Sequence, residues 1–440
     1  MSSKVVKNQI LALSGQVLPA ALGMVSFMWL VRILDPKVLG EYLIYMTSVV
    51  LFEMVKSGGL QSALVMKVSD KDPVKRNRVI GSAYWLGGIV VFLSGLILLV
   101  NYFLPYGSVD SGFKVFCLWY SVLGIITLPL HIAEAEAVAD QNLIFLLLLR
   151  ILQSINPLIV AIFAFLGFSS LQWLATVHVG VNVLLLIYVL ISKKTNPALI
   201  LKKTKEEVRS LVNLIKYTLA TLGTTNILKS ADTFLIGSFL GPTFVALYAI
   251  PQKLTELFEI PLRTLSTTAF PQLAAHHNAR DKHGFNNSFI SYLTWAYILY
   301  IPGLILAFIL APFLVLLIGG EKYANSADIF RVFVFFGAFL PLNRITGIVL
   351  DAIQKPGLNF LKVATMASVN IIADIAALYF SGDLRWVAFA SVVNAATGCF
   401  LGLFFIKKAG VLNDEKIMPL VVRNFSEILN KVKLKLAISR

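Results

Sequence analysis

Charged side chains lie inside long apolar stretches of this chain, at spacings that place them on shared helix faces. Glu53 and Lys56 are three residues apart, and so are Lys229 and Asp232. The candidate binding residues are Glu53, Lys56, Lys229, Asp232, Lys253, Glu256, Glu259, Arg263 and Arg344. Lysine and arginine can bind phosphate or another anion, whereas the carboxylates can accept hydrogen bonds from hydroxyl groups or carry protons.

Two interpretations of these charges remain open. They could be intrahelical ion pairs that only stabilise packing. A charge at the centre of a bilayer costs at least about 2.5–3.5 kcal/mol, so a set of this size favours one polar cavity that all of them face. His131 and Glu134 share a helix face, but no second histidine or carboxylate pattern accompanies them. His276, His277 and His283 lie together and could bind a metal, but a hydrophilic loop is the simpler interpretation. We expect no metal and no cofactor.

The elements that carry these charges are predicted to be membrane helices. Of the 440 residues, 58% are hydrophobic and only 14% are charged, which excludes a soluble enzyme. A span with its connection takes about 35 residues, so the length predicts about twelve crossings. The predicted spans are 8–34, 38–66, 80–103, 113–137, 142–166 and 171–191, then 211–240, 243–272, 286–318, 324–350, 357–380 and 384–406.

Lysine and arginine are distributed unequally between the connections, which predicts the orientation. One side holds Lys67, Lys71, Lys75, Arg76, Arg78, Lys193, Lys194, Lys202, Lys203, Lys205 and Arg209, whereas the other clearly holds only Lys37, Lys322 and Arg385. Both termini are therefore expected to be cytoplasmic. The net charge of +15 falls between apolar runs and not on a folded basic face, so no nucleic-acid partner is expected.

An internal repeat relates the two halves of the chain. At an offset of 206 residues, Leu34 aligns with Leu240 and Pro36 with Pro242, and the triplet Leu-Phe-Glu recurs at 51–53 and 257–259. Six predicted spans separate the copies, so both have the same orientation in the membrane. This predicts an all-α polytopic membrane protein with two six-helix lobes, related by a parallel repeat around a central polar cavity. The predicted divisions are an N-terminal lobe (1–191), a basic cytoplasmic linker (192–210), a C-terminal lobe (211–406) and a basic amphipathic cytoplasmic tail (407–440).

Several local motifs resemble those of one transporter family. Residues 30–42 read L-x-R-x-L-x-P-x-x-x-G-x-Y, similar to the first turn of the polysaccharide-transport oligosaccharide flippases. Residues 232–248 resemble the turn between their seventh and eighth helices, and residues 270–273 resemble the end of the eighth helix. The wider group is the multidrug, oligosaccharidyl-lipid and polysaccharide exporter superfamily. The resemblance implies alternating access and an undecaprenyl-diphosphate-linked oligosaccharide, carried from the cytoplasmic to the periplasmic leaflet of the inner membrane. The chain departs from this family in one respect. The cavities of the family are often described as cationic, whereas in this chain acidic residues are at least as numerous as basic ones within the predicted spans.

The leading hypothesis is therefore a flippase for an O-antigen or exopolysaccharide repeat unit, and not an enzyme. No GxxxxGK[ST] loop occurs in the sequence, so coupling to H⁺ or Na⁺ is one expectation, with membrane lipids and polysaccharide polymerase or export proteins as partners. The alternatives are a cation-coupled multidrug antiporter, a peptidoglycan-precursor flippase and a membrane glycosyltransferase or polymerase. An acid-rich cavity favours the antiporter, whereas the short predicted extracytoplasmic loops argue against the glycosyltransferase.

Overall fold

A computed structural model describes residues 3–68, 72–103 and 111–410, and every element in these ranges is helical. The first elements are α1 (Ser3–Ile33), α2 (Pro36–Met54), the π-helical η1 (Val55–Leu60), α3 (Gln61–Val68), α4 (Pro73–Phe103), α5 (Ser111–Ala139), α6 (Leu143–Phe165), α7 (Leu171–Ile191) and the 3₁₀ turn η2 (Pro197–Lys202). The remaining elements are α8 (Lys205–Phe239), α9 (Pro242–Asn278), α10 (Lys282–Ile309), α11 (Ala311–Gly319), η3 (Glu321–Ser326), α12 (Ala327–Ala352), α13 (Pro356–Phe380) and α14 (Leu384–Lys408). The predicted tail 411–440 lies outside the described residues.

The length and apolar composition of its helices identify this chain as a multi-pass membrane protein. Within the described ranges, nine helical segments are long and apolar enough to cross a bilayer, and α1 adds a shorter apolar stretch at Leu18–Ile33. Helices α8 and α9 are also long, with 35 and 37 residues, but they carry more charge than the other segments. The all-α membrane fold is thereby confirmed, whereas the count of twelve spans stays a prediction.

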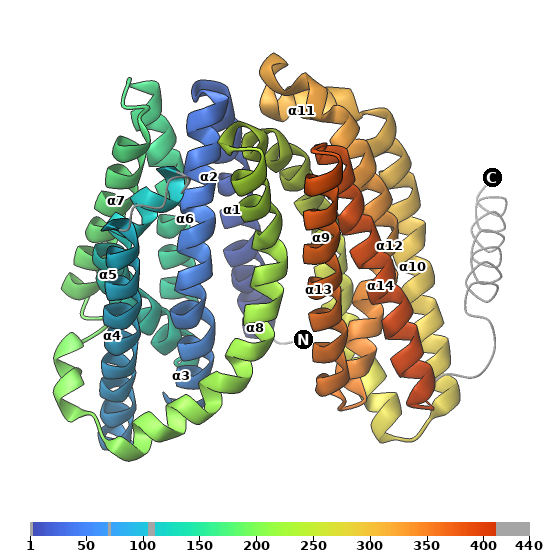
Figure 1. The fold of residues 1–440 in the computed structure, drawn as a ribbon. Helices are drawn as coiled ribbons and strands as arrows, with labels where there is room; N and C mark the ends of the chain where they lie inside the picture. The colour runs from blue at the N-terminus through green and yellow to red at the C-terminus, as the bar shows by residue number, and fades with distance from the viewer. Residues whose placement is uncertain (1–2, 69–71, 104–110, 411–440) are drawn as a thin grey trace. The chain divides into compact units, whose positions relative to one another are not determined.

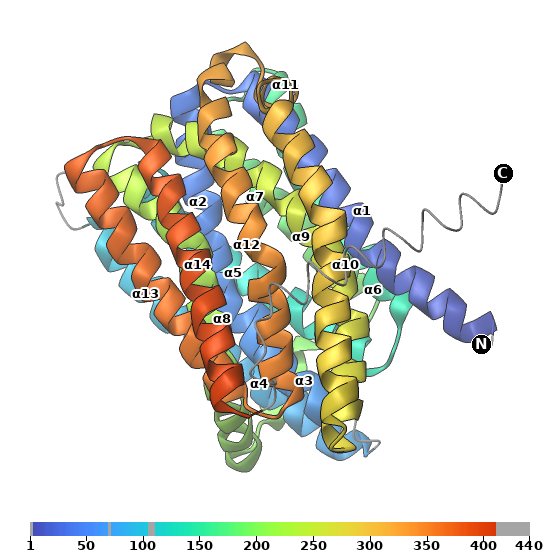
Figure 2. The ribbon, with the colours of Figure 1, turned by 90° about the vertical axis from the view of Figure 1, so that its right-hand side faces the viewer.

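The chain divides into two compact units, Met1–Ala246 and Leu247–Arg440. In the first unit, α2, η1 and α3 form one continuous helix that packs against α5 and α8, while α1 packs on α6 (Figure 1). In the second unit, α12 lies between α10 and α14, with α13 against α14 (Figure 2). Phe285 and Phe289 of α10, Val349 of α12 and Ile406 of α14 form much of the buried core there.

The predicted repeat is visible in the helix boundaries. Helices α1 and α8 end at Ile33 and Phe239, and helices α2 and α9 begin at Pro36 and Pro242, each pair 206 residues apart. Proline suits the first turn of a helix because its missing N–H has no intrahelical partner there. The starts of α2 and α9 approach so closely that a Cβ on Gly40 would lie 1.7 Å from the carbonyl oxygen of Pro242.

The predicted linker 192–210 is packed and not a free loop. Its η2 turn lies against α4, where a Cβ on Gly81 would come within 2.0 Å of the carbonyl oxygen of Leu199. The Tyr84 and Thr195 hydroxyls are hydrogen-bonded, which also fastens this segment to α4. The first compact unit continues through α8 to Ala246, so its boundary differs from the predicted lobe boundary. The lobe assignment itself stays a prediction.

An arginine–carboxylate cluster joins the beginning of α4 to the end of α5. Arg76 donates to both oxygens of Asp140, at 2.6 and 2.7 Å, and to Glu136 at 3.3 Å. The Arg76 guanidinium holds the pKa of the exposed Asp140 carboxyl below its usual range. The attraction is therefore present at neutral pH and is lost as the pH falls through the lowered pKa of Asp140.

Candidate functional site

A π-helical segment interrupts the long helix Pro36–Val68 at its centre. The segment is η1, with the sequence Val-Lys-Ser-Gly-Gly-Leu, and the chain continues in helical geometry on both sides. Gly58 and Gly59 allow α8 to approach, since a Cβ at these positions would lie 2.4 and 2.9 Å from the side chains of Leu222 and Leu219. Short π-helical segments are frequent at functional sites because they redirect one turn of side chains. Here the segment begins two residues after Glu53 and contains Lys56.

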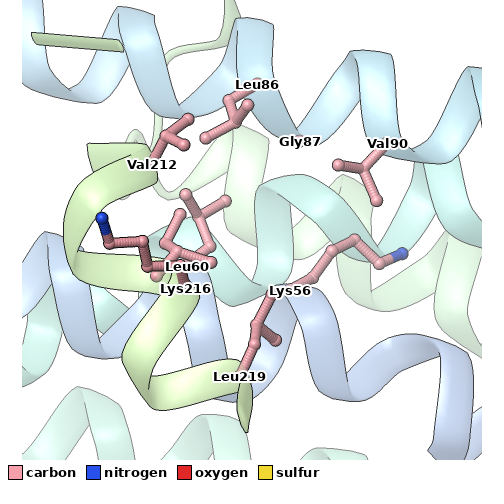
Figure 3. A pocket seen from close by; sticks show the side chains of 9 residues that line it. Lys56, Leu60, Leu86, Gly87, Val90, Val212, Lys216 and Leu219 are labelled. Carbon is pink, nitrogen blue, oxygen red and sulfur yellow. The ribbon is translucent and has the colours of Figure 1, made fainter. Parts of the chain in front are cut away.

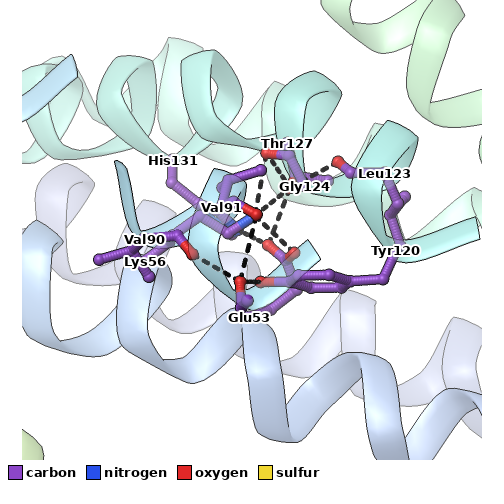
Figure 4. Close-up of polar contacts among 10 residues, drawn as sticks. Glu53, Lys56, Val90, Val91, Tyr120, Leu123, Gly124, Thr127 and His131 are labelled. Atoms are coloured by element: carbon purple, nitrogen blue, oxygen red, sulfur yellow. Dashed lines mark hydrogen bonds and ion pairs between the residues drawn. The ribbon is translucent and has the colours of Figure 1, made fainter. Parts of the chain in front are cut away.

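Glu53 and Lys56 form an enclosed ion pair between α2/η1 and α5 (Figure 4). The Lys56 Nζ lies 2.6 Å from Oε1 of Glu53, and it donates to Oγ1 of Thr127 at 2.8 Å and to the carbonyl oxygen of Gly124 at 3.0 Å. Each of the three ammonium N–H donors therefore has an acceptor. Only 1% of Lys56 and 8% of Glu53 are exposed.

The second carboxylate oxygen of Glu53 is also occupied. Its Oε2 accepts from the Thr127 hydroxyl at 2.9 Å and lies 2.9 Å from Nε2 of His131. No hydrogen-bond partner of the His131 Nδ1 is found in the described part of the chain. The cluster is therefore a carboxylate that contacts one lysine, one hydroxyl and one imidazole. Thr127 and His131 were missed as partners of Glu53, although their spacing of four residues on one helix face was a signal.

A cavity of about 170 Å³ lies beside this cluster, between η1, α4 and α8 (Figure 3). The stem of Lys56 lines it together with Leu60, Val90 and Leu219, and Lys216 of α8 lines it as well. The Lys56 ammonium itself is directed to the partners on α5. The apolar stem of Lys56 therefore lies between the cavity and the ion pair.

Two further candidates of the first unit lie on α8. Lys229 is exposed and Asp232 is buried, and both have polar or electrostatic contacts.

Buried hydrogen bonds elsewhere in this unit join Tyr45 to His178, at 2.9 Å between the hydroxyl and Nδ1, and Asn182 to the His178 carbonyl oxygen, also at 2.9 Å. The prediction did not include Tyr45 or His178.

The other five candidates lie in the second unit, four of them along α9. Lys253 contacts Glu256 at 2.7 Å, and Arg263 contacts Glu259 at 3.1 Å. These side chains are accessible: 39% of the Glu259 side chain and 59% of the Arg263 side chain are exposed. We call Lys253, Glu256, Glu259 and Arg263 the α9 stripe.

Arg344 of α12 extends this polar surface. Its Nε donates to the Ser266 hydroxyl of α9 at 2.9 Å, one turn beyond Arg263. Nearby, Lys362 of α13 is only 2% exposed and donates to the carbonyl oxygen of Asn343 at 2.9 Å, and it was not predicted.

Glu53 and Glu259, which the repeat aligns, have different surroundings: Glu53 is enclosed, whereas Glu259 is accessible. The central cavity between the lobes stays a prediction.

Known structures place this fold in one class of membrane protein. The chain is similar to the lipid II flippase MurJ in an inward closed conformation, with 16% identity, a TM-score of 0.73 and coverage of 97% of this chain and 92% of that chain. An inward-facing multidrug resistance MATE family transporter of the MOP superfamily matches with 15% identity, a TM-score of 0.72 and coverage of 90% and 98%. A MOP superfamily transporter from Pyrococcus furiosus matches with 14% identity, a TM-score of 0.60 and coverage of 92% and 95%. The chain therefore has the polytopic fold of these transporters.

The family follows from the sequence itself. The model of the polysaccharide biosynthesis protein family matches residues 29–328, so the chain belongs to this family. No curated protein matches the chain in sequence.

Proposed function

We propose that the protein moves an undecaprenyl-diphosphate-linked oligosaccharide from the cytoplasmic to the periplasmic leaflet of the inner membrane by alternating access. The accessible α9 stripe carries this proposal. Charged side chains within membrane helices face a water-filled or protein-lined space, because contact with hydrocarbon is too costly. In a polysaccharide biosynthesis protein, such a surface suits a sugar chain and its diphosphate. Polysaccharide polymerase or export proteins would act on the product.

The roles of the charged residues differ with their accessibility. Arg263 and Arg344 are exposed, so they can form charge-assisted hydrogen bonds to a diphosphate. Glu256 and Glu259 can accept hydrogen bonds from sugar hydroxyls. Lys56 has its three donors engaged inside the first unit, so we assign it to holding Glu53 in place and not to the diphosphate.

Coupling to protons is proposed for the enclosed cluster. Its partners, a lysine, a hydroxyl and an imidazole, would stabilise the charged Glu53 carboxylate in one arrangement of the helices. A second arrangement that separates Glu53 from Lys56 would favour the protonated carboxyl. Such a difference between two states is the requirement for ion-driven transport. Na⁺ is the alternative coupling ion.

Neutralising the exposed arginines is expected to block export of the lipid-linked glycan. The Arg263→Gln, Arg344→Gln double variant should accumulate to the normal level, since both side chains are exposed, but should reduce export at least tenfold. Export is measured as the glycan that becomes accessible to a periplasmic polymerase or ligase in cells. Lys322→Gln, a change of the same kind at an exposed lysine of η3, serves as the control.

Normal glycan export by the double variant would remove the stripe from the mechanism. Loss of efflux of a cationic drug with unchanged glycan export would instead support the multidrug antiporter, whose acidic binding surface the carboxylates of α9 could supply.

The proposed orientation can be tested with a membrane-impermeant thiol reagent on intact cells. Cysteine in place of Lys322 should react, whereas cysteine in place of Lys202 should react only after permeabilisation. The native Cys117 and Cys399 are buried, so the background should be low. Labelling at 202 from outside would overturn the assignment of cytoplasmic termini.

A further inference from the structure

An apolar groove runs along the outside of α4 and α5 in the first unit, apart from the charged clusters. Its volume is about 630 Å³, and Gly88, Phe92 and Leu99 of α4 and Ile125 of α5 line it. These positions are accessible, and 69% of Phe92 is exposed. A Cβ on Gly88 would meet nothing within 4 Å, so the absence of a side chain there leaves open space.

The dimensions of the groove suit one hydrocarbon tail. Its lining on α4 extends from Tyr84 to Leu99, which at 1.5 Å per residue corresponds to about 22 Å along the helix. One leaflet contributes about half of the roughly 30 Å hydrocarbon core. A single chain lying along α4 could therefore fill the groove from the membrane surface to beyond the bilayer centre.

One end of the groove is basic. Pro197 and Ile200 of η2 close this end. Lys193 and Lys194 precede η2, Lys202 is its last residue and Lys203 follows it, and all four are exposed. The Lys203 Nζ lies 4.3 Å from the centre of the Trp85 ring, and Trp85 follows Tyr84, which lines the groove. Lysines at a membrane surface attract anionic lipid headgroups.

We infer that the groove binds one acyl chain of an anionic glycerophospholipid, with the headgroup against the lysines at and beside η2. The occupant is a phospholipid and not the polyprenyl diphosphate of the proposed substrate because these four lysines are all exposed and spread along eleven residues, 193–203. That arrangement attracts a headgroup lying at the surface, whereas a specific diphosphate site would enclose its ligand with converging donors. The lipid would hold η2, and with it the connection from α7 to α8, at the membrane surface.

Native mass spectrometry of the purified full-length protein tests this inference. Phosphatidylglycerol is expected to remain bound at least fivefold more than phosphatidylethanolamine with the same acyl chains. Gly88→Leu should abolish the retention by filling the groove, whereas Gly180→Leu should not, because it adds the same side chain on α7 at a position with equally open surroundings. Lys202→Ser with Lys203→Ser should reduce the preference for phosphatidylglycerol.

A photoreactive diazirine in the acyl chain of phosphatidylglycerol gives a second measurement on the unaltered protein. Crosslinks should map to residues 84–99 and 121–129. Equal retention by the Gly88→Leu variant, equal binding of the two phospholipids, or crosslinks elsewhere would each overturn the inference. Displacement of phosphatidylglycerol by equimolar polyprenyl phosphate would overturn it as well, by assigning the groove to the substrate tail.

Discussion

Replacing Lys56 by methionine is expected to lower the stability of the folded protein by about 3–5 kcal/mol, because Glu53 then remains buried without its cation. The ammonium of Lys56 contacts Glu53, Thr127 and Gly124, so three acceptors lose their donor together. The loss should appear as a lower midpoint of thermal unfolding in detergent, followed by tryptophan fluorescence or by the monodisperse fraction on gel filtration.

The exposed ion pair on α9 supplies a control for this change. Arg263→Met also removes the cation of an intrahelical pair, but the Glu259–Arg263 pair is largely exposed and should contribute only about 0–1 kcal/mol. A second control is the Glu53→Gln, Lys56→Met double variant, which removes both charges and should recover most of the lost stability. If Lys56→Met destabilised the protein no more than Arg263→Met, the enclosed ion pair would be disproved.

The double variant also separates a structural from a coupling role of Glu53. If Glu53 carries the coupling proton, the variant should accumulate normally and its export should no longer depend on the proton gradient. If the pair only stabilises packing, the remaining export should keep its gradient dependence. The second result would remove Glu53 from the mechanism while leaving the proposed role of the α9 stripe intact.

Gly40→Ala is expected to destabilise the first unit by about 1–3 kcal/mol or more, because one added methyl group would overlap the backbone of Pro242. Backbone atoms cannot move aside as a flexible side chain can, so the starts of α2 and α9 would have to separate. The amount of folded protein and its unfolding temperature should both fall.

Gly23→Ala is the control for the Gly40 prediction. Gly23 lies in α1, and an added Cβ there has nothing within 4 Å. Alanine favours a helix over glycine by about 1 kcal/mol, so this variant should be neutral or more stable. Equal behaviour of the two variants would show that α2 and α9 do not approach at Gly40.

Much of this protein could be predicted from its sequence, because a bilayer limits the folds that apolar runs can adopt. Backbone polar groups in hydrocarbon must be satisfied within the segment, so long apolar runs such as 87–100 form helices. The repeat could also be recognised from the sequence, because proline favours the first turn of a helix wherever the helix lies, and Pro36 and Pro242 both begin helices. The pairs along α9 also follow from spacing, because residues three or four apart on one helix are neighbours wherever the helix lies.

Only the tertiary structure decided which of these pairs is enclosed. Glu53–Lys56 and Glu259–Arg263 are both acid–base pairs one helical turn apart, yet α5 covers the first pair with Thr127 and His131, residues 74 and 78 positions away from Glu53. The position of η2 was also decided only by the tertiary structure, because its packing on α4 depends on the small volume of Gly81. Hydropathy and spacing describe one helix at a time, whereas the rotation of each helix against its neighbours depends on the fit of many side chains. That fit determines which charges are buried with partners and which remain accessible.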